Sequence, residues 1–583
     1  MNIPCPHCSA LHWLDERVSS SSKHSPEFSM CCARGHVSLP LLPTPPTSLH
    51  ELYTNQSTQA REFRSNIVLY NRALTFTSLG AEQDHEINDG SGPPIFRIHG
   101  ELKHWSGSLL PQQGHAASYA QLYIYDPKSA MKCRMNRNPT LRPDTMQLLQ
   151  QLLLDNNGYA SIYQHAFEIL EQFDAPDYSI RLCATPNKYS GYNNLPTVDE
   201  VAVIIPGTSN QGDNRDIILS RRPTLRNSDD GKKHYQNLQR ISDGHPAYAP
   251  LHYVLLFPYG EPGWHWDLKL TTGKRLTLRQ YAAFRLHDRQ NEFSTILHGG
   301  QLLHHYIVDM FAGIDQNRLH WLTNNQSQLR LSHVQGMEDA LNGQQDDHIT
   351  LSNIGQRIFL PSSYSGGPRD MHQRFQDSMA IARHFKKIDI FLTITANPNW
   401  PEIKRELLPT QQPHDRPDLI ARVFKMKSDA LMHLITQKGI FGHCVAHVKT
   451  TQFQKRGFPH DHILIILEES YKLSTPTAID EVIWARWPDP ITQPHLFEIV
   501  KKYMLHGPCG ELNKRSPCMR NGKCRFGFPK AFQDRTTLSE DGYPSYYRPN
   551  DGRSYVVNGF LYDNRWIAPY NPFCCEFMDG HAL

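Results

Sequence analysis

The clearest candidates for chemistry in this chain are two histidines, His460 and His462, within the stretch GFPHDHILIIL. Successive residues of a β-strand point to opposite faces, so histidines separated by one residue project from the same face. Imidazole nitrogens are common ligands of divalent cations, and a pair on one rigid strand supplies half of a metal site. The chain contains 32 histidines, so an ordinary pair of surface or core histidines is the alternative interpretation.

A second set of potential ligands opens the chain. Cys5 and Cys8 are followed, after a loop, by Cys31, Cys32 and His36. Two thiolates three residues apart, closed by a second Cys or His group about 20 residues later, have the spacing of a tetrahedral structural zinc site. Such a site replaces the hydrophobic core that so short a segment lacks. Free thiols are the alternative, and the spacing leaves open which of the last three residues complete the site.

A third set lies near the end of the chain, where His506, Cys509, Cys518 and Cys524 alternate with Gly and Pro turns. This spacing suits a second small zinc knuckle, with a loop of reduced thiols as the alternative. Basic side chains between and beside these residues would form a surface that contacts phosphates. They are Lys514, Arg515, Arg520, Lys523 and Arg525.

The elements that hold the histidine pair can be predicted from the surrounding pattern. The apolar run 463–467 follows a turn that contains Gly457 and Pro459, which predicts a strand, and residues 443–453 predict its antiparallel partner. The amphipathic stretch 416–435 predicts a helix that covers this sheet.

Further elements are predicted upstream. The segments FRIHGEL, AQLYIYD, VAVIIPG and VLLF predict strands, the segments DTMQLLQQLLLDNN and YQHAFEILEQF predict helices, and the Pro-rich stretch LPLLPTPPTSLHELY predicts an extended linker. His298, His304 and His305 lie in and before a predicted helix, where adjacent histidines cannot share one metal, so we interpret them as a partly exposed helix.

The loop PSSYSGGPRD precedes another predicted helix, which starts near Arg369. We expect Phe375, Met379 and Phe385 of this helix to pack inward. Arg369 has two equal interpretations, a contact with a phosphate backbone or a salt bridge at the helix start.

Composition places limits on the class of protein. At 583 residues, with 39% hydrophobic and 10% aromatic residues, the chain is long enough for several domains and for a sizeable core. We expect a soluble intracellular protein, because no stretch approaches a membrane span and no signal peptide is recognisable. In that setting its 12 cysteines favour metal ligands or free thiols over disulfides. A net charge of +3 allows nucleic-acid binding only through local patches.

The histidine region also resembles a known family. The run QFQKRGFPHDHILIIL, together with FLTITANPNWPEI upstream, resembles the replication-initiator segment of Helitron transposases, which are rolling-circle endonucleases of the two-histidine (HUH) class. Four further segments also resemble Helitron sequences: the N-terminal cysteine segment, RIHGELKHWSGSLLP, HGPCG…SPC…GKC and DNRWIAPYNPF. The resemblance therefore spans nearly the whole chain. The first family motif, a strand that ends in a Thr, Asn and Pro turn, is matched by Phe391, Leu392, Thr393, Thr395, Asn397 and Pro398.

The resemblance implies a metal-dependent nuclease core that acts on single-stranded DNA. It implies that His460 and His462 hold Mg²⁺ or Mn²⁺, and that Gln452 stands where the family commonly carries a Glu ligand. An amide oxygen is a weaker donor to these cations than a carboxylate. We therefore expect weak metal binding. The expected DNA-binding residues are Arg369, Lys455 and Arg456, together with the basic residues of the C-terminal cysteine segment.

The departures from the family argue against catalysis. Helitrons carry two tyrosines about one turn apart on a helix downstream of the cysteine segment, and we expect the chain to be truncated before it. The comparable pair in this chain is Tyr543 and Tyr547, which are four residues apart. Pro544 lies between them and disfavours a helix on which both hydroxyls share one face. Asp461 replaces a small or apolar residue on a buried face, so we expect a partner, a raised pKa, an open sheet edge or a decayed fold. No G-x-x-x-x-G-K-[ST] loop occurs, which excludes ATP binding of that kind.

These patterns together predict an α+β, multidomain chain. We expect a zinc knuckle at 1–40, a linker and helix at 41–94, a mixed α/β domain at 95–235, a Helitron helicase-like, HUH-type antiparallel-sheet core covered by helices at 236–470 and a Cys/His basic segment at 471–583. The expected function is that of a Helitron-type fragment that binds single-stranded DNA in the nucleus, with structural Zn²⁺ and an incomplete endonuclease site expected to be inactive. A full-length transposase is a second expected partner, and no membrane partner is expected. A non-catalytic DNA-binding protein or an inert transposon remnant is the alternative.

Overall fold

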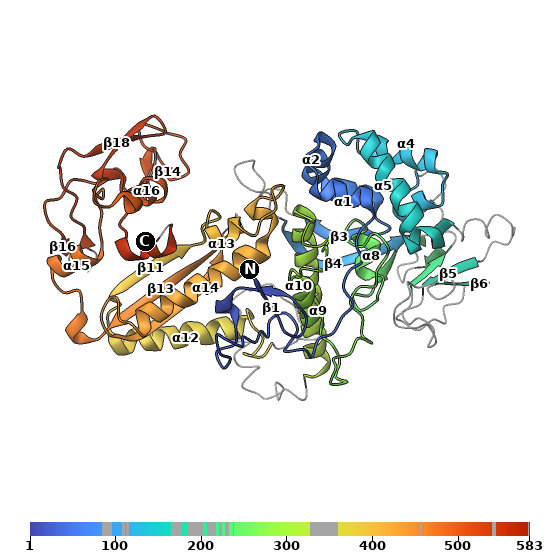
Figure 1. Cartoon of the computed structure of the whole chain (residues 1–583), viewed down its shortest axis with the longest axis horizontal. Coiled ribbons are helices and arrows are strands. Elements are labelled where there is room, and N and C mark those ends of the chain that lie inside the picture. Colours follow the sequence, from blue (N-terminus) through green and yellow to red (C-terminus); the bar gives the residue numbers. More distant parts are fainter. Residues whose placement is uncertain are drawn as a thin grey trace. The chain divides into compact units, whose positions relative to one another are not determined.

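The computed structural model divides the chain into two compact units, each described here by itself (Figure 1). Unit 1 contains Met1–Trp321 and Leu407–Arg416, and unit 2 contains Leu322–Glu406 and Pro417–Leu583. The described residues are 1–83, 96–107, 111, 116–164, 178–182, 202–206, 217–220, 224–227, 233–236, 238–326, 360–454, 457–538, 544–580 and 582. The predicted segment 236–470 is thus divided between the two units.

Unit 1 begins with a short hairpin and a set of helices. Strands β1 (Ile3–Pro4) and β2 (Leu11–His12) pair antiparallel and are followed by the 3₁₀ turn η1 (Leu14–Glu16). The next elements are α1 (Thr47–Thr54), α2 (Thr58–Ser65), α3 (Ile67–Leu74), η2 (Tyr119–Tyr123), α4 (Pro127–Arg137) and α5 (Pro143–Asn156). Helix α4 starts at a favourable cap, because the Asp126 side chain accepts hydrogen bonds from the backbone N–H groups of Lys128 and Ser129 and Pro127 occupies the first helical position.

The strands of unit 1 form small antiparallel sheets. Strand β4 (Ile98–Gly107) lies between β3 (Ser78–Gln83) and β10 (Leu238–Ile241). Strand β5 (Tyr178–Leu182) lies between β6 (Ala202–Pro206) and β7 (Ile217–Ser220), and β8 (Thr224–Asn227) pairs with β9 (Lys233–Gln236).

One hydrophobic cluster joins the N-terminal hairpin to the helices of unit 1. These include α8 (Tyr248–His252), α9 (Leu278–Arg285) and α10 (Gln301–Asn324), and the cluster runs from Cys5 and Phe28 to Met310. The short 3₁₀ turn η4 (Pro413–Asp415) belongs to this unit as well. The N-terminal cysteine segment therefore packs into a larger core.

Several elements of unit 1 differ from those predicted. The end of the predicted linker forms α1, because Leu49, Leu52 and Tyr53 are spaced to bury one helical face. AQLYIYD forms the 3₁₀ turn η2 in place of a strand, and VLLF forms turns in place of a strand, although VLLF is buried as expected. Short apolar runs do not distinguish strands from other buried segments, which explains both errors. The predicted helix YQHAFEILEQF lies mostly outside the described residues, whereas α5, β4 and β6 confirm their predictions.

Unit 2 is built around a three-stranded antiparallel sheet. Strand β13 (Pro459–Leu467) lies between β11 (Ile390–Thr395) and β12 (Cys444–Phe453). Strand β12 is the predicted antiparallel partner, and β11 is the strand of the first family motif. The turn from β12 to β13 places Gly457 at φ +76°, a conformation that glycine adopts without a steric penalty. In the register, His460 lies opposite Thr395 and Gln452, and His462 lies opposite Thr393 and Thr450.

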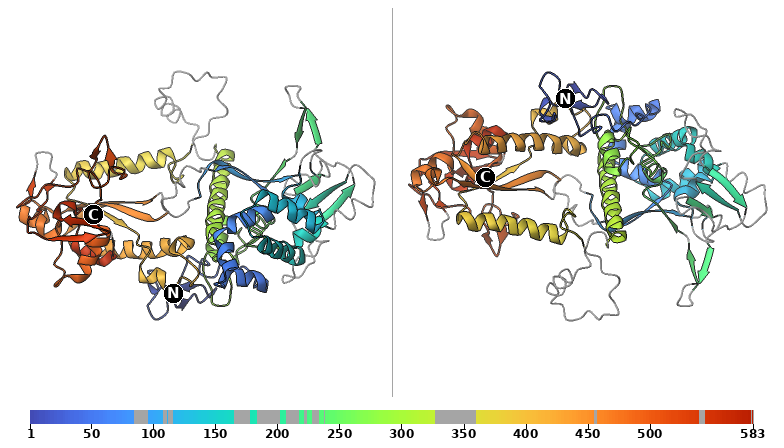
Figure 2. Two further views of the ribbon diagram at one scale, coloured as in Figure 1. Left: turned by 90° about the horizontal axis from the view of Figure 1, so that it is seen from above. Right: turned by 90° about the horizontal axis from the view of Figure 1, so that it is seen from below.

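Helix α14 (Pro417–Thr436) covers one face of this sheet, as predicted, and packs on β12 and β13. Its buried positions recur at helical spacing, from Leu419 and Val423 to Leu431 and Ile435. Figure 2 shows the strands of the sheet between α14 and α12 (Pro368–Phe385). The prediction that Phe375 of α12 packs inward is wrong, because its side chain is 58% exposed.

The remainder of unit 2 packs around the end of β11. Helix α13 (Pro401–Lys404), η5 (Glu469–Tyr471), α15 (Pro476–Val482), α16 (Pro494–Tyr503), η6 (Asn564–Trp566) and α17 (Pro572–Met578) alternate with two-stranded hairpins. The hairpins pair β14 (Met519–Arg520) with β15 (Lys523–Cys524), β16 (Thr537–Leu538) with β17 (Pro544–Ser545), and β18 (Ser554–Val557) with β19 (Phe560–Asp563). Asn397 and Trp400, just after β11, donate hydrogen bonds to backbone carbonyls at the end of α17.

No helix among the described residues is long and apolar enough to cross a membrane.

Candidate metal and nucleic-acid site

The two histidines of β13 face each other across one side of the sheet. Their Nε2 atoms lie 2.9 Å apart, with the rings nearly perpendicular at 86°. Two nitrogens that bind one cation at about 2.1 Å and at right angles to each other are separated by about 3 Å. The pair therefore has the geometry of two neighbouring ligands of a single cation, and the prediction that both imidazoles lie on one face is confirmed.

Strand β11 orients the second histidine. The Nδ1 atom of His462 lies 3.1 Å from Thr393 Oγ1, and its ring stacks on Phe391 at 5.7 Å between centroids. A hydrogen bond at Nδ1 leaves Nε2 directed at the partner imidazole, which is the arrangement that a metal-ligating histidine uses. Burial, followed by the proximity of His462, lowers the pKa of His460, so its neutral, metal-binding form is favoured.

A third strong ligand is missing around this pair. Gln452 lies directly opposite His460 on β12, at the position predicted for the third ligand. Among the described residues, neither histidine belongs to a group of three or more His, Cys, Asp or Glu side chains able to share one ion. The pair is therefore half of a cation site with an amide beside it.

Asp461 lies on the opposite face of the sheet and is fully buried. One of its oxygens accepts a hydrogen bond from Ser428 of α14 and lies 3.3 Å from Lys449 Nζ on β12, while its other oxygen, Oδ1, has no partner among the described atoms. The sequence suggested that this carboxylate would need a partner, and the structure provides a charged one, Lys449. Asp461 therefore connects α14 to strands β12 and β13 of the sheet.

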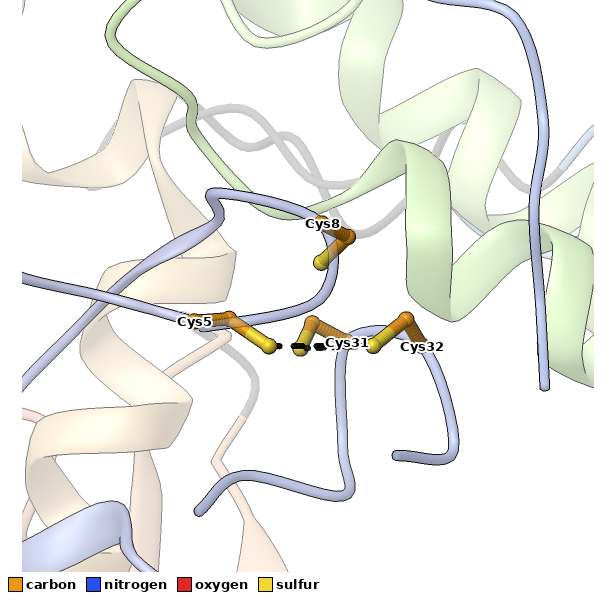
Figure 3. Close-up of side chains that lie close together, drawn as sticks. All are labelled: Cys5, Cys8, Cys31 and Cys32. Carbon is orange, nitrogen blue, oxygen red and sulfur yellow. Dashed lines mark hydrogen bonds between the residues drawn. The ribbon is translucent and has the colours of Figure 1, made fainter. Parts of the chain in front are cut away.

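The N-terminal cysteines form a compact group of four thiols, with all sulfur atoms within 4.8 Å of one another. Cys5 and Cys8 come from the first loop, and Cys31 and Cys32 come from a second loop that approaches it (Figure 3). Cys32 Sγ lies 3.7 Å from Cys5 Sγ and 3.8 Å from Cys31 Sγ. Ligands at 2.3 Å in a tetrahedron are separated by about 3.8 Å, so the thiols fit a zinc-sized ion. His36, left open by the spacing, is not part of the group.

Two groups outside the cysteines support this cluster. The backbone N–H of Gly35 donates to Cys32 Sγ at 3.2 Å, and the Arg289 guanidinium donates to the Cys8 carbonyl at 3.0 Å and lies 3.9 Å from Cys8 Sγ. Hydrogen bonds from the Cys31 and Cys32 thiols lower the pKa of Cys8 to about 6. Donors of this kind stabilise thiolates, the form that binds metal. Arg289 was missed in the sequence because nothing in a linear pattern relates it to Cys8.

The second ligand group brings together His506, Cys509, Cys518 and Cys524, again with all ligand atoms within 4.8 Å. Cys524 Sγ lies 3.3 Å from His506 Nε2, and Ser516 Oγ lies 3.3 Å from Cys518 Sγ. The His506 ring stacks on Phe528 at 4.2 Å between centroids, which fixes its orientation. Both clusters could hold a metal ion.

Basic side chains surround the second cluster. The five predicted here, Lys514, Arg515, Arg520, Lys523 and Arg525, are all exposed. The Arg525 guanidinium lies over the exposed Phe526 ring at 4.5 Å. Arg369 is exposed in the first turn of α12. Lys455 and Arg456, in the turn between β12 and β13, lie outside the described residues.

Tyr547, one of the two tyrosines considered in the sequence, does not lie on a helix. It follows β17, its N–H donates to Thr536 Oγ1 at 2.9 Å and the Arg486 guanidinium lies over its ring. Tyr543 lies outside the described residues. A tyrosine that sequence reasoning overlooked, Tyr503 of α16, donates its hydroxyl to Asn397 Oδ1 at 3.2 Å, just beyond β11.

Comparison with known families identifies a part of the chain that contains the histidine pair. Residues 281–465 match the model of the Helitron helicase-like domain at N-terminus, a stretch that contains β11, β12, β13 and the histidine pair. No curated protein matches the chain.

Proposed function

We propose that this transposon-related chain, whose residues 281–465 form a Helitron helicase-like domain, binds single-stranded DNA. It binds the strand next to an incomplete divalent-cation site and does not cut it. The observation that carries the proposal is the 2.9 Å approach of His460 Nε2 to His462 Nε2 on the sheet face opposite to that of Asp461, with Gln452 in place of a carboxylate. Bound Mg²⁺ or Mn²⁺ would polarise a phosphate there. Structural Zn²⁺ in both cysteine clusters, and action in the nucleus, belong to the same proposal.

The surface beside the histidines supports a single strand as the ligand. Phe391 is 59% exposed on the histidine face of the sheet, opposite Leu464 and two residues along β11 from Thr393, the residue opposite His462. Exposed aromatic rings stack on unpaired bases, and each such stack contributes about 1–3 kcal/mol. Lys and Arg side chains near the second cysteine cluster would add salt-dependent phosphate contacts.

Binding can be tested with a matched pair of phenylalanine variants. We expect Phe391→Ala to weaken binding of a labelled single strand about tenfold in fluorescence anisotropy, with little change for a duplex. Phe453→Ala is the control, because Phe453 is 63% exposed on the same sheet but alternates to the opposite face from Gln452. Equal losses in both variants would contradict the stacking role, and no binding by the unaltered protein would leave an inert remnant.

The absence of cleavage needs a separate assay. A covalent phosphotyrosine intermediate requires a tyrosine hydroxyl positioned beside the cation. We expect labelled single strands to remain uncut after incubation with Mg²⁺ or Mn²⁺ and denaturing electrophoresis. A denaturation-resistant adduct that disappears in Tyr503→Phe or Tyr547→Phe would overturn this part of the proposal and identify the nucleophile.

A second candidate function is DNA binding without any metal at the histidines. The exposed basic residues beside the second cysteine cluster favour this function, since they lie outside the three-stranded sheet and can contact phosphates without a metal at the histidines. In that case Lys523→Gln and Arg525→Gln would reduce binding, whereas His460→Ala would change neither metal content nor affinity. Such a protein could assist or interfere with a full-length transposase, which would be its second partner.

A further inference from the structure

A cavity of about 270 Å³ lies in unit 1 between α3, η2 and α4. Its polar lining comes from Arg72, Arg134, Arg137, Ser118, Tyr119 and Asn138, and none of its lining residues carries a carboxylate. Nothing in the sequence drew attention to these residues, which come from three separate elements.

The deepest of the three arginines is Arg134, which is 2% exposed. Its Nε donates to the Ala73 carbonyl at 3.1 Å, its Nη1 donates to Gln150 Oε1 at 2.6 Å, and its guanidinium lies 4.8 Å from the Tyr123 ring centroid. Its Nη2 is buried without a hydrogen-bond partner among the described atoms. In proteins, buried charges are normally paired and buried donors are normally hydrogen-bonded. Arg134 is an exception, because among the residues that the structure describes no negatively charged group pairs with it and its Nη2 donates no hydrogen bond.

The other two arginines of the cavity also have no acidic partner among the described residues. Arg72 and Arg137 are exposed at the cavity, and Arg137 Nη2 donates to the Ala116 carbonyl at 3.3 Å. Within the described part of the chain, no carboxylate forms an ion pair with Arg72, Arg134 or Arg137. Three arginines that line one cavity without a carboxylate in its lining create a site of positive potential, and the guanidinium fork matches the oxygens of a phosphate.

We propose that this arginine cavity binds the phosphate group of one nucleotide, either a free mononucleotide or the terminal nucleotide of a nucleic acid strand. Its volume lies just below the roughly 300–1,000 Å³ of typical small-molecule pockets, which suits one nucleotide better than a longer segment. Tyr119, held at φ +51° and 39% exposed, presents a ring on which a base can stack. The inference does not rest on the histidine pair, which belongs to the other unit.

The test uses two double variants of the full chain with the same change in charge. In Arg72→Gln/Arg137→Gln the exposed arginines of the cavity are neutralised, while Arg134 keeps its bonds to Ala73 and Gln150. In Lys128→Gln/Lys132→Gln two exposed lysines of the same helix, α4, are neutralised outside the cavity. Isothermal titration is performed with inorganic phosphate, with deoxyadenosine monophosphate, and with an oligonucleotide that carries either a 5′-phosphate or a 5′-hydroxyl.

We expect binding that depends on the phosphate group and is weakened about tenfold or more by the arginine variant but not by the lysine variant. Binding of the mononucleotide supports a free ligand, and binding that requires the 5′-phosphorylated strand supports a strand end. The proposal is overturned if no phosphate compound binds, if the 5′-phosphate makes no difference and the mononucleotide does not bind, or if both variants lose affinity equally.

Discussion

At the scale of single residues, one oxygen ligand separates the histidine pair from a stronger metal site. His460 and His462 already hold their Nε2 atoms 2.9 Å apart, and Thr393 already orients one ring. What the described residues lack is a carboxylate close enough to share one ion with both imidazoles. Gln452 has the right register and nearly the right shape, so restoring the charge requires little rearrangement of the backbone.

We therefore predict that Gln452→Glu raises the affinity for Mn²⁺ about tenfold, because a charged oxygen ligand replaces a neutral amide. The measurement is titration of Mn²⁺ followed by electron paramagnetic resonance of the free ion. His447→Glu is the control, since it places the same charge on β12 at an exposed position that alternates to the other face. Equal gains in both variants would indicate a general charge effect and contradict the site.

At the scale of elements, a buried carboxylate joins three of them. Asp461 of β13 contacts Ser428 of α14 and Lys449 of β12, and its side chain is fully buried while that of Lys449 is 26% exposed. Removing one partner of a buried ion pair costs about 3–5 kcal/mol, but the partly exposed lysine can regain water. The loss should therefore fall below that range.

We predict that Asp461→Ala lowers the free energy of unfolding of unit 2 by about 2 kcal/mol. Urea denaturation, followed by hydrogen exchange of peptides from α14, measures the change. Thr451→Ala, at an exposed position opposite Asp461, should have little effect. An unchanged stability in the aspartate variant would mean that the lysine and serine contacts contribute nothing to the attachment of α14.

The two cysteine clusters make a prediction that can be counted. Purified protein should contain close to two zinc ions per chain, and Cys5→Ser and Cys509→Ser should each remove about one, because each cluster loses one of its four ligands. Cys133→Ser and Cys444→Ser, which lie outside both groups, serve as controls. Elemental analysis by mass spectrometry is the measurement. A folded protein without zinc would show that the thiols act without metal.

The elements also show how far sequence reasoning reaches. The pairing of β12 with β13 and the single face shared by His460 and His462 follow from local pattern, because a turn between two neighbouring strand segments and alternation along a strand are local features. The stretch VLLF was assigned to a strand and forms buried turns, because burial depends on distant partners that a short window does not contain. Arg289 beside Cys8 and the three arginines of the cavity depend on packing between remote segments, and no spacing rule reveals them.

At the scale of the whole molecule, histidine protonation relates the stability of unit 1 to pH. His298 and His305 of unit 1 are half-buried beside aromatic rings, with His298 stacked on Phe293 at 4.0 Å and His305 on Phe96 at 3.7 Å. Burial lowers the pKa of each of these two histidines to about 4.

The lowered pKa values of His298 and His305 make unit 1 sensitive to acid. In the unfolded chain a histidine titrates near pH 6.5, so between about pH 6.5 and 4 the unfolded state binds more protons than the folded state. The free energy of unfolding must then fall as the pH falls. The contribution is fully present above about pH 6.5 and is lost progressively until about pH 4, on the order of 3 kcal/mol for each histidine.

We predict that hydrogen exchange of peptides from α10 accelerates as the pH falls from 6.5 to 4, after correction for the intrinsic rate, and that His305→Phe reduces this acceleration. Phenylalanine retains a ring beside Phe96 but binds no proton, so the variant removes the linkage and keeps most of the packing. His24→Phe, at an exposed position, is the control. If the acid sensitivity of α10 were the same in His305→Phe and in the unaltered protein, His305 would not be a source of it, and protonation would act on unit 1 through other groups.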